Sequence, residues 1–336
     1  MTSSSQIDQQ LDINYNLRGA SAMLEPKKSY KIEFENNISL LGMRNDDDWI
    51  LNSLYNEFSN IKEKLSIDIW DELSGINKYQ AEYVELIIDG QYQGLYLLQE
   101  TVEHKTYDFE NGNNYIYTRA NEYLGPIDSN TSVAISEDGD IMINAYQLDK
   151  VKIKDIEKSE ELIKMISYDF TNNHLNEIFE YDYNNFVKYN IFINIIIGLD
   201  NHNKNQKIVL RNNGDDTFVI QKTPWDFDQS FAAELPDYAQ DGYIIDQARN
   251  NNTFDSKELK KLEADVYFSF REHFTDEQLT ALVDNYIEFL VGSGAIYRDN
   301  FKWQDKDFVN NTKNVLEIGI NRLNFMDEYL EGYYGV

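Results

Sequence analysis

Two stretches decide the fold expected for this chain: Gly-Leu-Asp-Asn-His-Asn-Lys-Asn at residues 198–205, and Pro-Trp-Asp-Phe-Asp at residues 224–228. Residues 183–199, just before the first stretch, read as a helix that is apolar nearly all round, and such a helix belongs in a core. Between the stretches, residues 206–221 read as a short hairpin across Asn-Asn-Gly-Asp. The expected order is therefore buried helix, polar loop, two strands and a pair of acids.

Four side chains in these stretches are the groups that phosphoryl transfer needs. In kinase-like folds, one carboxylate orients the acceptor hydroxyl, while a nearby amide and a second carboxylate bind Mg²⁺. We therefore expect Asp200 to orient or accept the proton of the acceptor hydroxyl. Asn205, together with Asp226 or Asp228, is expected to bind the metal.

The spacing of these residues has a plainer explanation. Asp and Asn are abundant here, so Asp200 and Asn201 are equally suited to end a helix, and Asp226 and Asp228 to cap the next element of the chain. Taken alone, the spacing favours that structural interpretation. The buried helix before the loop and the hairpin after it reverse the balance and favour a catalytic site.

The rest of the chain predicts an α+β fold. The first hundred residues read mostly as strands, with a helix over residues 59–73 capped by Ser59 or Asn60 and a hairpin over residues 81–98 that turns at Asp89-Gly90. Residues 104–150 are expected to be irregular, and further helices are expected over residues 156–170, 256–272, 276–290 and 305–330. We predict a two-lobed, protein-kinase-like fold, with a mixed strand and helix N-lobe at residues 1–103 and a mainly helical C-lobe at residues 104–336.

Composition excludes several classes of partner and site. With 30 Lys and Arg against 59 Asp and Glu, the formal net charge of −29 repels nucleic acid and anionic membranes, so neither is expected as a partner. The chain has no Cys, so it has no disulfide or thiolate metal site, and its four scattered His do not predict zinc. No apolar run approaches the length of a membrane span, so no membrane insertion is expected.

A basic segment near the N-terminus stands out in so acidic a chain. It comprises Arg-Gly-Ala-Ser at residues 18–21 and Pro-Lys-Lys-Ser-Tyr-Lys at residues 26–31. Lys or Arg near a flexible loop suits triphosphate recognition. A strand edge protected by Lys is the structural alternative, and the two interpretations are evenly weighted. The chain contains neither a G-x-G-x-x-G nor a Walker A loop.

These motifs resemble the spore coat protein H (CotH) kinase family over residues 12 to 330. The resemblance is carried by the basic segment, by the stretches at residues 198–205 and 224–228, and by three further segments. These are Leu-Leu-Gly-Met at residues 40–43, Asp-Trp-Ile-Leu-Asn at residues 48–52 and residues 90–100. The resemblance implies an atypical protein kinase fold and phosphorylation of Ser or Thr by ATP, with Mg²⁺ as the metal and Mn²⁺ as an alternative. It also implies spore coat proteins as substrates.

The resemblance assigns roles to particular residues. Asp200 matches the catalytic-loop Asp, and Asp226, which lies nearest the end of the second strand, matches the metal-binding acid, with Asp228 as a close rival. Lys28 or Lys31 would contact phosphates.

Four further residues complete the comparison with the family. Arg18 and Ser21 belong to the phosphate loop, where Ala20 replaces the family's usual Asn but still leaves backbone N–H groups available. Glu100 follows a strand where a hinge would fall, which suggests a place near the adenine. Glu63 is a candidate for the acidic partner on the helix.

Two other functions stay open on the sequence alone: a non-catalytic coat or cell-surface scaffold or adhesin, and a kinase-fold small-molecule phosphotransferase.

The location that the resemblance suggests is the spore coat or the cytoplasm of the sporulating mother cell. Residues 1–5 do not form a signal peptide, and a strand-like segment occupies residues 11–15. An extracellular location stays open if the natural N-terminus lies upstream.

Overall fold

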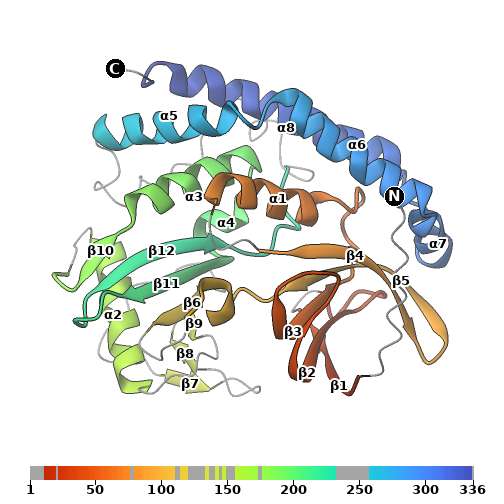
Figure 1. Ribbon diagram of the computed structural model, residues 1–336, viewed down its shortest axis with the longest axis horizontal. Helices are drawn as coiled ribbons and strands as arrows, with labels where there is room; N and C mark the ends of the chain where they lie inside the picture. The colour runs from red at the N-terminus through yellow and green to blue at the C-terminus, as the bar shows by residue number, and fades with distance from the viewer. Residues whose placement is uncertain are drawn as a thin grey trace. The chain divides into compact units, whose positions relative to one another are not determined.

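The computed structural model describes residues 11–19, 22–75, 79–109, 114–119, 133–135, 141–143, 146–148, 156–172, 176–231 and 257–334 (Figure 1). They belong to two compact units. The smaller unit contains Met1–Tyr55, Tyr79–Thr101 and Gly294–Asp305, and the larger contains Asn56–Lys78, Val102–Ser293 and Lys306–Val336. These units are drawn differently from the expected lobes, since the helix near residue 65 belongs to the larger unit and a segment near residue 300 to the smaller.

The smaller unit is built on an antiparallel sheet of five strands in the order β1-β2-β3-β5-β4. Its strands are β1 (Ile13–Arg18), β2 (Ser29–Ser39), β3 (Asn45–Asn52), β4 (Ala81–Ile88) and β5 (Gln91–Glu100). The turn between β4 and β5 confirms the predicted hairpin, because Asp89 and Gly90 both have positive φ, 51° and 75°. One face carries a core of buried apolar side chains: Met43, Trp49, Leu51, Tyr96 and Leu98.

Part of the basic segment has a structural role in this unit. Lys27 is 1% exposed. Its Nζ lies 2.7 Å from Asp299 Oδ1 and also donates to the carbonyl oxygen of Leu95. Asp299 lies on the helix α7 (Ala295–Lys302) and also accepts the Leu95 N–H at 2.8 Å. Gly94 allows the Lys27 side chain to lie close to the backbone of β5, since a Cβ at this position would lie 2.8 Å from Lys27 Cε. The pair therefore joins α7 to β5.

The larger unit contains a sheet of seven strands in the order β10-β12-β11-β6-β9-β8-β7. Its strands are β6 (Tyr115–Arg119), β7 (Val133–Ile135), β8 (Ile141–Ile143), β9 (Tyr146–Leu148), β10 (Phe179–Tyr181), β11 (Gln206–Asn212) and β12 (Phe218–Pro224). The antiparallel pair β11–β12 is the predicted hairpin. The expectation that residues 104–150 are irregular is wrong, because β6 pairs with β11. Strands of three to five residues are too short to show a clear period.

Helix α3 (Tyr183–Ile195) is central in the larger unit, where it contacts α1 (Lys62–Ser74), α5 (Lys257–Arg271) and α8 (Phe308–Glu331). The others are α2 (Ile156–Asn172), the single turn α4 (Asp200–Asn203) and α6 (Asp276–Gly292), besides the short 3₁₀ helix η1 (His104–Tyr107). Figure 1 shows α3 between the β11–β12 pair and α5. The side chains of α3 confirm the predicted buried helix, since Tyr189, Phe192 and Ile193 are 0% exposed.

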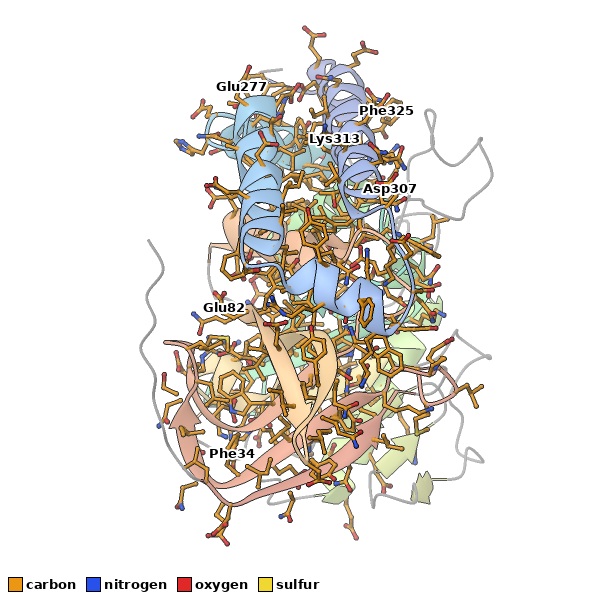
Figure 2. All side chains as sticks on the ribbon, turned by 90° about the vertical axis from the view of Figure 1, so that its right-hand side faces the viewer. Phe34, Glu82, Glu277, Asp307, Lys313 and Phe325 are labelled. Atoms are coloured by element: carbon orange, nitrogen blue, oxygen red, sulfur yellow. The ribbon has the colours of Figure 1, made fainter. Side chains whose placement is uncertain are left out.

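Side-chain carboxylates stabilise the start of two helices, α1 and α8. The predicted cap of α1 by Ser59 or Asn60 is wrong. Helix α1 begins at Lys62, and the buried carboxylate of Glu57 accepts the Ile61 N–H at 3.0 Å and the Ser59 hydroxyl. Helix α8 begins after Asp307, whose side chain accepts the Asn310 N–H; Figure 2 labels Asp307 at this end.

Antiparallel strands in the first hundred residues and helices towards the C-terminus confirm the predicted α+β, kinase-like fold class. The sequence predicted only the β11–β12 hairpin in this region, whereas the structure has a sheet of seven strands. Within the described ranges, every helix is either too short or too polar to cross a bilayer.

Glu100 ends β5 as a buried acid in the smaller unit. Its Oε2 accepts the Gln80 N–H at 3.1 Å, and Oε1 lies 3.8 Å from Arg44 Nε. Burial raises the pKa of the Glu100 carboxyl to about 7, although the Arg44 charge opposes the rise. The protonated form is therefore favoured by folding.

Replacing Glu100 should flatten the dependence of stability on pH. Because the folded pKa lies above the usual value of 4.5, the stabilising contribution is complete below pH 4.5 and is lost as pH rises through about 7. It amounts to on the order of 3 kcal/mol. Urea unfolding at pH 5 and pH 8 should show a smaller difference in free energy for Glu100→Gln than for wild type. Glu82→Gln, at an exposed position on β4, is the control; an unchanged pH dependence in Glu100→Gln contradicts the assignment.

Candidate active site

A pocket of about 250 Å³ in the larger unit brings together two acids and a lysine from separate segments. Asp200 lies at the start of α4, Asp228 lies beyond the end of β12, and Lys62 opens α1. The other lining residues come from these segments, from the chain before α1 and from α8: Asn56, Phe58, Ser59, Leu199, Gln229, Asn311, Asn314 and Val315. Asp200 and Asp228, both predicted from the sequence, thus share one site although 28 positions apart in the chain.

The turn between α3 and α4 places Asp200. Ile197 has a φ of 52°, which is unfavourable for a β-branched residue and marks a strained turn. Gly198 is the next residue, and a Cβ on it would lie 2.8 Å from Asn201 Oδ1, so a larger residue would displace the Asn201 side chain. Asp200 is half-buried, and its Oδ2 lies 2.9 Å from Lys204 Nζ. The turn and this ion pair therefore orient the carboxylate.

Asn201 joins the polar loop at residues 198–205 to the acidic stretch at residues 224–228 through hydrogen bonds. Its side chain is buried, and Nδ2 donates to the carbonyl oxygens of Trp225 at 2.8 Å, Asn205 at 3.2 Å and Asp226 at 3.4 Å. The Asn201 carbonyl accepts the hydroxyl of Tyr189 on α3 at 2.7 Å. Asn201 is therefore structural, as the plainer interpretation of the loop suggested, while the neighbouring Asp200 faces the pocket.

The acidic stretch is held on both of its sides. Asp226 is exposed and has a φ of 61°, a conformation that Asp tolerates better than most residues. Between the acids, Phe227 is buried, and its N–H donates to Glu63 Oε2 at 2.8 Å. The Phe227 ring packs edge-on against Phe192 of α3 at a centroid distance of 5.6 Å. These contacts fix the backbone that leads into Asp228.

Asn205, the predicted amide ligand, lies at the junction of the two stretches. Its φ is 52°, and its carbonyl oxygen accepts the Trp225 N–H at 3.0 Å. The backbone of Asn205 thus helps to join the loop to the acidic stretch, and its half-buried side chain is outside the set that lines the pocket. Metal binding by Asn205 and Asp226 stays a prediction.

Neighbouring groups in the pocket act on the Asp228 carboxyl. Asp228 is exposed as a residue, but partial desolvation of its carboxyl raises the pKa, and the neighbouring Asp200 carboxylate raises it further. A side-chain hydrogen bond with Gln229 and the Lys62 charge act in the opposite direction. Two carboxylates that repel each other are a suitable oxygen donor set for Mg²⁺ or Mn²⁺.

Lys62 is the site residue that sequence reasoning missed. It is 7% exposed and lines the pocket beside the two acids. A Lys in the first turn of a helix is disfavoured by the helix dipole, so its presence there was a usable signal. The signal was hidden because Lys usually lies on a solvated helix face.

The other predicted site residues described by the structure lie in the smaller unit. Arg18 ends β1, and Lys28 Nζ donates to the Met23 carbonyl at 2.8 Å. Lys31 Nζ lies 2.6 Å from Glu33 and 3.3 Å from Asp48, so this lysine is ion-paired. Ser21 lies outside the described residues. Their contacts with nucleotide, and that of Glu100, stay predictions.

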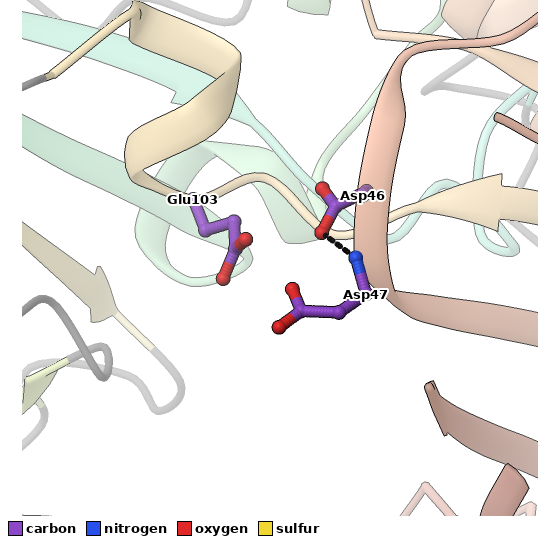
Figure 3. Close-up of side chains that lie close together, drawn as sticks. All are labelled: Asp46, Asp47 and Glu103. Carbon is purple, nitrogen blue, oxygen red and sulfur yellow. Dashed lines mark hydrogen bonds between the residues drawn. The ribbon is translucent and has the colours of Figure 1, made fainter. Parts of the chain in front are cut away.

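Figure 3 shows three further acids, Asp46, Asp47 and Glu103, and local structure accounts for the carboxylates of Asp46 and Glu103. Asp46 Oδ1 accepts the N–H groups of Asp47 at 2.6 Å and Asp48 at 3.1 Å, which shapes the start of β3 in the smaller unit. Glu103 belongs to the larger unit, where it forms a capping box with Thr106 at the start of η1.

Replacing Asn201 should destabilise the larger unit and loosen the acidic stretch. Asn201→Ala leaves the buried Trp225 carbonyl without its 2.8 Å donor, at a cost of about 1–3 kcal/mol in the free energy of unfolding. Urea unfolding measures the loss, with Asn213→Ala in the exposed hairpin turn as the control. Equal stability of Asn201→Ala and wild type refutes the role given to this amide.

Comparison with known proteins identifies the family of the chain. A model of the family described as CotH kinase protein matches residues 16–327, which include both stretches and Lys62. No curated protein matches the chain. A kinase family implies ATP and a divalent metal, and the donor set in the pocket suits such a metal. Since the match spans nearly all of the 336 residues, the chain belongs to the CotH kinase family and has a kinase-like function in general.

Proposed function

We propose that this protein is an atypical protein kinase that transfers the γ-phosphoryl group of ATP to Ser or Thr hydroxyls of spore coat proteins. The metal would be Mg²⁺, with Mn²⁺ as an alternative. The observation that carries the proposal is the pocket shared by Asp200, Asp228 and Lys62. A non-catalytic scaffold has no use for two mutually repelling carboxylates beside a buried lysine.

Asp200 is the residue that would handle the acceptor. Its carboxylate would orient the hydroxyl and take its proton as the hydroxyl oxygen bonds to the γ-phosphorus and the bond to the β,γ-bridging oxygen breaks, releasing ADP. Lys204, 2.9 Å from Asp200, would keep the carboxylate oriented.

Asp228, with Asp226 and Asn205 as the further predicted ligands, would hold the divalent ion. When bound, this ion would neutralise charge on the phosphate oxygens. The place of Asp228 beside Asp200 in one pocket supports this role, since a cation there would relieve the repulsion between the two carboxylates.

Lys62 would contact the phosphates from its place beside the two acids. An ammonium group binds phosphate as a point charge, and a largely buried one does so with little competition from water. Lys28, Lys31, Arg18 and Ser21 remain the predicted phosphate contacts of the smaller unit, and Glu100 the predicted neighbour of the adenine.

The substrate and location are inferred from the family and from charge. An acidic chain of net charge −29 suits basic, Lys-rich segments of coat proteins. The proposed location is the spore coat or the mother-cell cytoplasm, and an extracellular protein is the alternative if the chain extends upstream.

Removing either acid should abolish phosphoryl transfer. Incorporation of ³²P from ATP with Mg²⁺ is expected to fall at least about 100-fold in Asp200→Asn and in Asp228→Asn, because each variant loses a charge that acts in the transition state. Asp216→Asn, in the exposed hairpin turn, should match wild type. Equal incorporation by all variants contradicts the site, whereas tight binding of Mg-ATP without transfer to any protein favours a small-molecule acceptor.

Replacing Lys62 should lower kcat/KM for ATP while leaving the protein folded. Loss of a charge-assisted contact of about 1.5–3 kcal/mol lowers kcat/KM for ATP by roughly 10–100-fold in Lys62→Ala. Lys62→Arg should recover part of the loss. The control is Lys313→Ala on α8, at an exposed position labelled in Figure 2. A folded Lys62→Ala variant with unchanged kinetics rules out the phosphate contact.

A further inference from the structure

Glu63 and Lys62 are neighbours on the first turn of α1, and they point to different partners. Lys62 lines the pocket, whereas the Glu63 carboxylate accepts the N–H of Phe227 at 2.8 Å. Successive helical residues are rotated by about 100°, so one turn can present one side chain to the pocket and the next to the backbone beside it. Glu63 is 2% exposed, so this bond is shielded from water.

A hydrogen bond to the Phe227 amide constrains the backbone of the acidic stretch next to both of its acids. It lies in the peptide between Asp226 and Phe227, one residue before Asp228. Asp226 has a φ of 61°, an uncommon conformation that the contacts on either side help to maintain. Asn201 fixes the carbonyl side of this turn through Trp225 and Asp226. Glu63 holds the amide side, through its bond from α1 to the Phe227 N–H.

A carboxylate is well suited to this contact. A bond from a main-chain N–H to a carboxylate is stronger than one between neutral groups, and the helix dipole favours an acid in the first turn. In conventional protein kinases the helix Glu instead pairs with a lysine. Here Glu63 reaches main chain, so that α1 provides both the lysine of the pocket and the bond that fixes the backbone of the acids.

We infer that Glu63 is a positioning residue, which holds the Phe227 amide and thereby sets Asp228 against Asp200 and Lys62 for cation binding. This inference rests on the proposed function, since it takes Asp228 as a metal ligand. It assigns no contact between Glu63 and substrate. The charge strengthens the bond, but an acceptor oxygen that reaches the amide is enough to hold it, so the reach of the side chain is the essential property for positioning.

Two conservative variants separate reach from charge. Glu63→Gln keeps the length and an acceptor oxygen but removes the charge, whereas Glu63→Asp keeps the charge but withdraws the oxygen by one methylene. Mn²⁺ affinity, measured by calorimetry without nucleotide, should fall about 10-fold in Glu63→Asp and stay within about 3-fold of wild type in Glu63→Gln. Glu72→Asp, at an exposed position of the same helix, is the matched control.

A second readout reports on the backbone directly. Hydrogen–deuterium exchange in peptides covering residues 224–231 should be faster in Glu63→Asp and as slow as wild type in Glu63→Gln. The inference is overturned if both variants match wild type in Mn²⁺ affinity and exchange, or if Glu63→Gln is the weaker variant, which would make the role one of charge. It is also overturned if Glu63→Asp weakens Mn²⁺ binding in an Asp228→Asn background as much as in wild type.

These results are distinct from a failure of the proposed function. If wild type transfers no phosphate from ATP, the kinase assignment fails, while the exchange and Mn²⁺ measurements still decide the role of Glu63. If transfer occurs and Glu63→Asp leaves exchange and Mn²⁺ affinity unchanged, the kinase assignment stands and the positioning role does not.

Discussion

The site depends on holding two carboxylates, Asp200 and Asp228, close together, so that the Asp200 charge adds to the rise in the pKa of Asp228 that partial desolvation causes. Like charges move apart unless the surrounding structure prevents it, and here several buried contacts do so. Asn201 bonds the carbonyls of the acidic stretch, and Glu63 bonds its amide. Lys62 supplies the compensating charge from α1. The repulsion therefore creates a position where a cation is favourable, which is the physical basis of the proposed metal site.

Helix α3 is the common support of these contacts. Its Tyr189 hydroxyl bonds the Asn201 carbonyl, and its Phe192 ring packs on Phe227, so both stretches rest on one buried helix. On another part of the helix, the buried Arg322 of α8 donates to the Asn194 carbonyl at 2.6 Å. A core helix with such anchors can hold strained residues such as Ile197 and Asp226 in place.

Sequence predicted the parts of the site that arise from local patterns. Helix α3, the β11–β12 hairpin and the two acidic stretches were recognisable because periodicity and turn residues are properties of neighbours in the chain. Lys62 was missed, because its place beside Asp200 and Asp228 depends on contacts across more than a hundred residues. The bond from the Ile61 N–H to Glu57 just before α1 was missed for a similar reason, since the Glu57 carboxylate lies outside the usual cap position. The basic segment was recognised, but its Lys27 proved to be buried against Asp299.

The most direct test of the central claim is the position of a metal in a crystal grown with Mn²⁺ and a non-hydrolysable ATP analogue. Anomalous scattering locates Mn²⁺ independently of any assumption about the site. The account predicts a peak bonded to the Asp228 carboxylate, with the phosphates of the analogue in contact with Lys62. A peak whose ligands exclude Asp228, Asp226 and Asn205, with phosphates away from Lys62, would contradict it.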